Sequence, residues 1–187
     1  MGEPVAIRVR PIKVIAEVLA VIAGIWIIIS IAGPEWVDVK FHNHGDTTWN
    51  WGLWIICNEF EDGHTVCMES DWVTVCLVFS IISFILTMAA SILGILGLFV
   101  AATFHTKRMF YLLAGIVMFT MALLELMVAI IFPIKFGEDI LSASNVKRWD
   151  FDWTYAFAWG GFIFGVGSAG FFLLPSERRE NPTTTYM

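Results

Sequence analysis

Four long apolar stretches divide the chain, at about residues 14–32, 73–103, 110–131 and 153–174. Each is close to or above the ~20 apolar residues that a helix needs to cross the hydrocarbon core of a bilayer. The second stretch is longer than that core requires, so we expect it to tilt or to project beyond the membrane. The pattern predicts an α-helical membrane protein with four spans in one domain.

The two longer polar segments, residues 33–72 and 133–152, show a different period. In the first of them, Val37, Val39 and Phe41 alternate with polar residues. Such alternation is typical of a β-sheet with one apolar face. The same two-residue period returns at the end of the second segment. It predicts one more strand, or a segment that continues directly into the fourth helix.

Composition and charge agree with a membrane protein. Hydrophobic residues make up 58% of the chain and charged residues 15%, whereas a soluble domain has about 25% charged residues. The formal net charge of −6 leaves no basic field for nucleic acid, so the partner that we expect first is the lipid bilayer. Lys and Arg gather before the first span, in the turn after the second and in the tail at residues 175–187. The positive-inside rule therefore predicts cytosolic N- and C-termini and two extracellular loops.

Cys57 and Cys67 are the two cysteines of the first loop, and they flank a predicted turn. Because the compartment outside the cell is oxidising, we predict a disulfide between them. For so short a ring, the chain-entropy model gives roughly 3 kcal/mol of stabilisation. Cys76 lies in the second span, where we expect it to pack as a small apolar side chain.

A group of residues in the first loop resembles the signature of a known family. Between the first two spans lie, in this order, Trp36, Gly52, Leu53, Trp54, Cys57 and Cys67. This order resembles that of the claudin and peripheral myelin protein superfamily. The resemblance implies a left-handed four-helix transmembrane bundle with a small extracellular antiparallel β-sheet of about five strands. It also implies that the Trp, Gly and Leu residues of the motif anchor the sheet to the mouth of the bundle.

The second half of the chain is similar to the brain cell membrane protein branch, a claudin-like branch associated with cadherin-based adherens junctions. The residues that carry this similarity are Pro133, Lys135, Phe136, Trp153, Trp159 and Gly160. The resemblance implies a non-enzymatic plasma-membrane protein at cell–cell junctions. Its function would be adhesion and coupling to the cytoskeleton, and its partners the cadherin complex or claudin-like neighbours.

Two alternative functions stay open. One is a paracellular barrier or cation-channel claudin, which the acidic first loop favours. Against it, only a short stretch separates Trp36 from Gly52, where pore-forming claudins place pore-lining strands. The other alternative is an auxiliary subunit of a receptor or ion channel, another role of four-span proteins with this loop motif.

No pattern in the chain indicates catalysis, a metal site or a cofactor. The motifs of serine hydrolases, zinc proteases and phosphate-binding loops are absent from the sequence, and the loop histidines do not form a four-ligand zinc pattern. Glu125 is an acid inside the third span, where acidic residues are often functional. We nevertheless expect its carboxyl group to form a hydrogen bond within the bundle, because no line of polar groups is evident in the spans.

Two further features concern association with other molecules. Gly161 and Gly165 stand four residues apart, a spacing that lets helix backbones approach closely. Packing within the bundle and lateral contact in a homo-oligomer are equally open. The chain ends in Thr185, Tyr186 and Met187, which resembles a ligand of a PDZ scaffold; the alternative is an unstructured tail.

Overall fold

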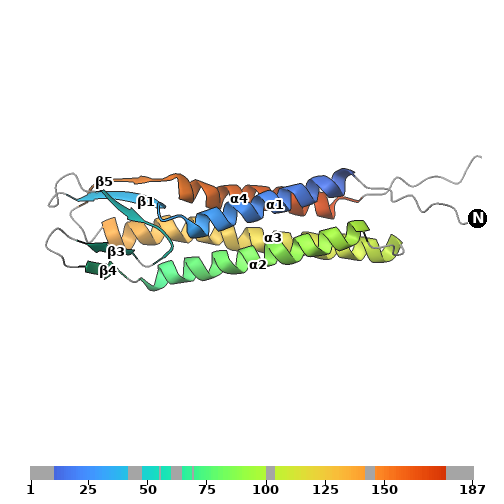
Figure 1. Ribbon diagram of the computed structural model, residues 1–187, viewed down its shortest axis with the longest axis horizontal. Helices are drawn as coiled ribbons and strands as arrows, with labels where there is room; N and C mark the ends of the chain where they lie inside the picture. Colours follow the sequence, from blue (N-terminus) through green and yellow to red (C-terminus); the bar gives the residue numbers. More distant parts are fainter. Residues whose placement is uncertain are drawn as a thin grey trace, which may run out of the picture.

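The computed structural model describes residues 11–41, 48–54, 56–59, 65–68, 70–99, 104–141 and 146–175. Four helices run side by side along the long axis, and the strands gather at one end, which we call the sheet end (Figure 1). The helices are α1 (Pro11–Ala32), α2 (Asp71–Phe99), α3 (Phe104–Phe136) and α4 (Trp153–Leu173). All four are long and apolar enough to cross a membrane, which confirms the predicted four-helix membrane fold.

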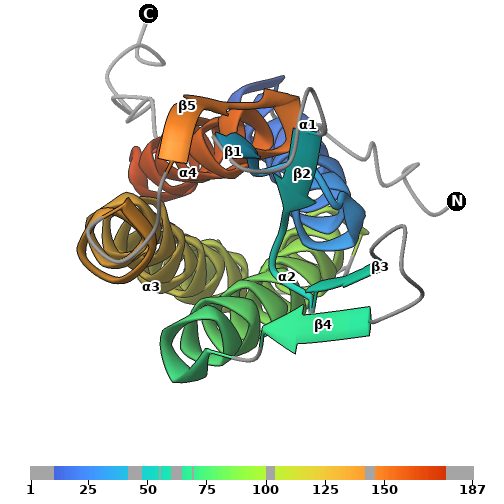
Figure 2. The same ribbon diagram turned by 90° about the vertical axis from the view of Figure 1, so that its left-hand side faces the viewer.

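The four helices close into a ring in which each contacts two neighbours. Helix α1 packs against α2 and α4, and α3 packs against the same two helices (Figure 2). The buried positions of α1, α2 and α4 are mostly Ala, Gly, Ser and Thr, whereas large side chains such as Ile28, Ile85 and Phe119 are about half exposed. Small inward residues allow close helix contact, and large outward residues match lipid tails.

The described residues form five strands at the sheet end, in two sheets. Strands β1 (Val37–Phe41), β2 (Thr48–Trp51) and β5 (Val146–Phe151) form an antiparallel sheet in the order β2-β1-β5. Strands β3 (Ile56–Glu59) and β4 (Thr65–Met68) form a separate antiparallel pair. The small antiparallel sheet is confirmed. The single five-stranded sheet that the resemblance implied is not found among the described residues, because the chain leaves β2 toward the end of α1 before it starts β3.

The third helix extends further than the sequence indicated. We expected the span to begin near residue 110 and to end at Ile131, with Pro133 after it. Instead, α3 begins at Phe104 and continues through Pro133 to Phe136, and a π-helical turn follows at Gly137–Leu141. A proline inside a helix removes one backbone hydrogen bond, and a side chain of α4 replaces it, as described below.

The buried apolar residues in the described part of the chain form two clusters. One fills the bundle between the helices. The other joins the inner face of the β2-β1-β5 sheet to the ends of the helices. We call this second cluster the sheet–bundle junction; its members include Trp36, Val37, Val39, Trp51, Leu53, Phe132 and Phe136.

Candidate functional site

Trp36 lies at the centre of the sheet–bundle junction and is fully buried. Its indole Nε1 donates to the carbonyl of Ser30 at 2.9 Å, and its backbone N–H donates to the carbonyl of Trp51 at 2.7 Å. Its ring packs against Phe132 of α3 and Tyr155 of α4, with centroid distances of 4.7 and 5.5 Å. One residue therefore connects α1, the sheet and two further helices.

The segment after β2 is held against the end of α1. A Cβ atom on Gly52 would lie 2.9 Å from the carbonyl oxygen of Gly33, so backbone contact leaves no room for a side chain. Leu53 is 1% exposed. Trp54 is half exposed, and its indole Nε1 donates to the carbonyl of Ile31 at 2.6 Å. A ring with a hydrogen-bonded N–H at the end of an apolar helix is typical of the membrane interface.

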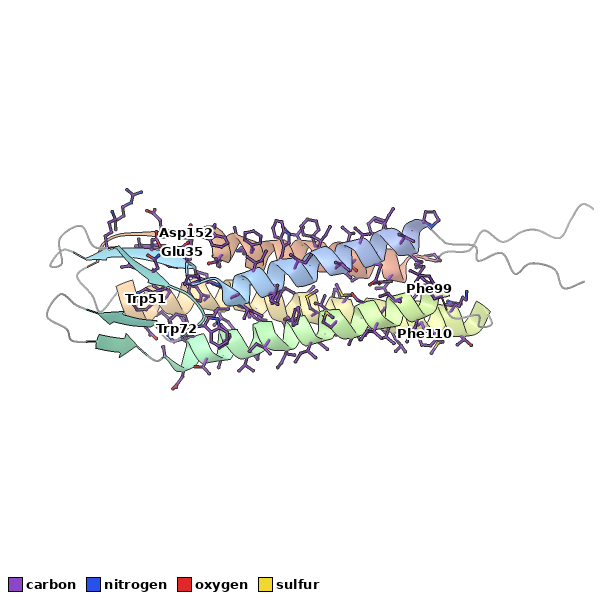
Figure 3. The ribbon with its side chains drawn as sticks, in the orientation of Figure 1. Glu35, Trp51, Trp72, Phe99, Phe110 and Asp152 are labelled. Atoms are coloured by element: carbon purple, nitrogen blue, oxygen red, sulfur yellow. The ribbon has the colours of Figure 1, made fainter. Side chains whose placement is uncertain are left out.

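Glu35 connects the sheet to the start of α4. Its carboxylate accepts hydrogen bonds from Asn50 of β2 and from the indole of Trp153, and its carbonyl accepts one from the hydroxyl of Thr154. Asp152 caps α4 by accepting from the backbone N–H of Trp153 at 2.6 Å. Glu35 and Asp152 both lie at the sheet end of the bundle (Figure 3). Trp153 was predicted as a site residue from the sequence, whereas Glu35 was not.

Pro133 and Tyr155 act together. Because Pro133 has no backbone N–H, the carbonyl of Ala129 one turn earlier loses its helical partner. The hydroxyl of Tyr155 on α4 donates to this carbonyl at 2.8 Å. The backbone group freed in one helix is therefore satisfied by the neighbouring helix, which explains why α3 continues past the proline.

Two residues near the end of α3 have different surroundings. Phe136 is fully buried and meets the ring of Trp51 edge to face at 5.6 Å. Lys135 is exposed, and its Nζ pairs with the carboxylate of Glu138 at 2.6 Å. Of these two residues, Phe136 belongs to the sheet–bundle junction and Lys135 does not.

Three glycines of α4, Gly160, Gly161 and Gly165, lie in close contact with side chains of neighbouring helices. A Cβ atom on Gly160 would overlap the indole of Trp26 on α1. The side chains that crowd Gly161 and Gly165 belong to α1 and α3, at 2.8 Å for Ile27 and 2.6 Å for Met121. Gly161 and Gly165 therefore pack within the bundle, the first of the two alternatives.

Trp159, beside these glycines on α4, is partly buried, and its ring meets Phe162 at 6.1 Å. Its side chain also interacts with the hydroxyl of Tyr155, which packs against the sheet–bundle junction. Trp159 is not itself a member of that cluster.

The bundle interior is more polar than we expected. Ser80, Ser83, Thr87 and Ser91 are all buried and follow one face of α2 at helical spacing. Glu125 of α3 is fully buried opposite this face, with Ser83 beside it. Among the described residues, however, neither carboxylate oxygen makes a hydrogen bond of normal geometry. Ser83 nevertheless interacts with this carboxyl group, so the expected hydrogen bond of Glu125 within the bundle stays a prediction. The expectation that the spans hold no line of polar groups is wrong, and the helical spacing of the serines in α2 was the signal for that line.

Lys13 closes the other end of the bundle. Its side chain is 2% exposed, and Nζ donates to the carbonyls of Phe171, Phe172 and Leu174 at 3.0, 2.8 and 2.8 Å. These carbonyls end α4, and a positive charge at a helix C-terminus is favourable. The sequence placed Lys13 only among the charges before the first span.

The backbone positions of the loop cysteines suit a disulfide. Cys57 of β3 lies directly opposite Cys67 of β4. Cα atoms that face each other in an antiparallel pair are ~4.5–5.5 Å apart, which is within the ~4.4–6.8 Å that a disulfide spans. The described part of the chain does not include their side chains, so the disulfide stays a prediction. Thr185, Tyr186 and Met187, like the loop histidines, lie outside the described residues.

The similarity of this chain to known proteins extends over nearly its whole length. The p53 apoptosis effector related to PMP-22 of Danio rerio is 27% identical over 173 residues, which is 89% of this chain and 85% of that protein. The comparisons do not distinguish the brain cell membrane protein branch, which stays a prediction. A sequence model described as the PMP-22/EMP/MP20/Claudin family matches residues 11–172, from the start of α1 almost to the end of α4. With four apolar helices and a small antiparallel sheet over one end, the chain belongs to the PMP-22/EMP/MP20/Claudin family.

Proposed function

We propose that the protein is an organiser of cell–cell junctions, which presents its sheet to neighbouring cells and recruits cytosolic partners through its tail. Family membership indicates a junction-type protein of the plasma membrane in a structural, non-enzymatic family. To this family-level statement the proposal adds an adhesive role and coupling to cadherin junctions. In this proposal the sheet end is extracellular and both termini are cytosolic.

The observation that carries the proposal is the rigid connection between the sheet and the bundle. Trp36 joins the sheet to α1, α3 and α4, and Glu35 joins it to α4. Gly52 leaves no gap between the end of β2 and α1. A recognition surface held in one orientation loses less conformational entropy on binding. Such a connection therefore favours a protein that displays its sheet to a partner.

The direct test is expression of the full chain in an epithelial monolayer with leaky junctions. We expect enrichment at cell contacts together with cadherin, without a direct change in the sodium-to-chloride permeability ratio. A uniform distribution over the plasma membrane, in cells that make normal contacts, would contradict the junction proposal.

The tail is tested separately. Deletion of Tyr186 and Met187 should leave membrane insertion intact and weaken capture of PDZ scaffolds, because the terminal hydrophobic group and carboxylate form the anchor of such ligands. The full-length chain with an unchanged C-terminus is the control in the same pull-down. Equal capture by both chains would remove the tail from the mechanism.

A cation-selective paracellular channel is the second candidate, and one observation favours it. Glu35, Asp150 and Asp152 lie close enough to Asp38 at the sheet end for their charges to raise the pKa of its carboxyl group. Such a concentration of negative charge attracts cations. If the monolayer gains a charge-selective conductance that Asp38→Asn abolishes, the channel function replaces the organiser.

A further inference from the structure

Four buried oxygen atoms on two adjacent helices have no hydrogen-bond partner among the described residues. They are both carboxylate oxygens of Glu125 on α3 and the hydroxyl oxygens of Ser80 and Ser83 on α2. All three side chains are fully buried. Buried polar atoms are nearly always paired, because an unpaired atom loses its hydration without replacement. These oxygens therefore point to a ligand that binds between the helices.

The carboxylate and the two hydroxyl groups lie at one level of the bundle. Ser83 lies beside the Glu125 carboxyl group. The charge of Glu125 also acts on the thiol of Cys76, about two turns away on the same face of α2. Ser80 stands between Cys76 and Ser83 on this face at helical spacing. The four oxygens are thus gathered where α2 packs against α3 (Figure 2).

No positive side chain neutralises Glu125 within the part of the chain that the structure describes. The one buried basic residue there is Lys13, and its Nζ is held by three carbonyls at the end of α4. Gly161 of α4 marks the level of the site, because a Cβ atom on it would lie 3.8 Å from Glu125 Cγ and 2.8 Å from Ile27 of α1. Lys13 precedes Ile27 by about four turns, or ~21 Å along α1.

We propose that Glu125, Ser80 and Ser83 bind one monovalent metal cation inside the bundle. All the ligands are oxygens, which hard cations prefer. One carboxylate is neutralised by a single positive charge, whereas a divalent ion would leave an excess charge in an apolar interior, which is costly. A proton also neutralises the carboxylate, but it bridges only two oxygens. A metal cation contacts all four at once.

A row of polar groups leads from this site to the end of the bundle closed by Lys13. Thr87 and Ser91 continue the buried face of α2 in that direction. Ser91 in turn interacts with the carboxylate of Glu17 on α1. In the opposite direction, the packed rings of the sheet–bundle junction fill the space between the helices and the sheet. The cation therefore enters from the Lys13 end, which the proposed topology places in the cytosol.

Protons and the metal cation compete for Glu125. Each cation that binds to the neutral carboxyl group releases one proton, so binding should weaken at acidic pH. The titratable groups that face this level in the described helices are the thiol of Cys76 on α2 and the phenol of Tyr155 on α4. Both are uncharged at neutral pH. The pH dependence should therefore come from Glu125 alone.

Thermal unfolding of the purified full chain in detergent tests the site, with Na⁺ as the probe. At slightly alkaline pH, ~150 mM NaCl should raise Tm by ~3–6 °C over choline chloride of equal ionic strength, for an apparent Kd near ~10 mM. Glu125→Gln keeps the shape of the side chain and removes its charge, so this gain should disappear. Ser83→Ala should reduce it. A gain with KCl instead of NaCl identifies K⁺ as the ion of the same site.

Glu138→Gln is the matched control, because it makes the same change at an exposed carboxylate outside the bundle. It should keep the full gain. A wild-type Tm that depends on neither NaCl nor KCl would overturn the inference, and Glu125 would then hold a proton. A gain that persists in Glu125→Gln would overturn it as well, because the ions would then act elsewhere. Both results leave the junction function standing.

Labelling of the wild type covers the case in which Glu125→Gln does not fold. An apolar carbodiimide reacts with neutral carboxyl groups inside a bundle, and peptide mass spectrometry reports each labelled residue separately. The cation that raises Tm should protect Glu125 over the same concentration range and leave Glu17, the internal reference, unchanged. Labelling of Glu125 that is insensitive to this cation would contradict the site.

Discussion

Replacing Tyr155 with phenylalanine removes one hydroxyl group and keeps the ring that stacks on Phe151 at a centroid distance of 4.5 Å. The hydroxyl is the donor to the carbonyl of Ala129, which has no partner in its own helix because Pro133 stands one turn later. A buried carbonyl left without a donor costs ~1–3 kcal/mol. In a chain of 187 residues, a cost of ~2 kcal/mol lowers Tm by roughly 4–8 °C.

The loss of stability in Tyr155→Phe should depend on Pro133. Pro133→Ala supplies the N–H that bonds the Ala129 carbonyl within α3, so the hydroxyl is no longer needed. Tyr155→Phe should then cause almost no further loss, which corresponds to a coupling of ~1–2 kcal/mol between the two positions. The assay is thermal unfolding of the purified full chain in detergent, followed by tryptophan fluorescence, for the wild type, both single variants and the double variant.

Thr120→Val serves as the control for loss of a hydroxyl. Thr120 Oγ1 donates to the carbonyl of Ile116 at 3.1 Å, but that carbonyl one turn earlier keeps its helical N–H partner. This variant should therefore unfold close to the wild-type temperature. An equal fall in Tm for Tyr155→Phe with and without Pro133 would refute the account, because the hydroxyl would then act through a group other than the Ala129 carbonyl.

Three more predictions concern the sheet end. Cys57→Ser and Cys67→Ser should each reduce surface delivery, measured by surface biotinylation, because the hairpin loses a crosslink of ~3 kcal/mol; normal levels of both would argue against the disulfide. Gly52→Ala should lower Tm, since its Cβ meets backbone at 2.9 Å, whereas Gly137→Ala, with open space around it, should not; equal melting of the two would be the contrary result. Asp38→Asn should raise Tm at neutral pH. A raised carboxyl pKa in the folded state contributes stability at acidic pH that is lost as pH rises through it. The gap to the wild type should therefore close on acidification, and a constant gap would exclude this cause.

The elements that depend on local pattern were predictable. The apolar lengths indicated four spanning helices, and the alternation around Val37 and Val39 indicated a strand with one buried face. The motif residues Trp36 and Gly52 could be singled out from their order along the chain. The helices and the strand depend on the spacing of apolar and small residues over a few helical turns or a few strand residues. That spacing is visible in the sequence itself.

Contacts between distant segments could not be predicted in this way. A proline is read locally as a helix end, and only the packing of α4 on α3 brings Tyr155 to the carbonyl that Pro133 frees. Lys13 looked like one more charge before a membrane span until folding placed it at the end of α4. Likewise, the like charges of β1 and β5 face each other through a strand register that joins residues more than a hundred positions apart. In each case the residue that a side chain contacts depends on which helices and strands are neighbours. The packing of the whole bundle determines those neighbours.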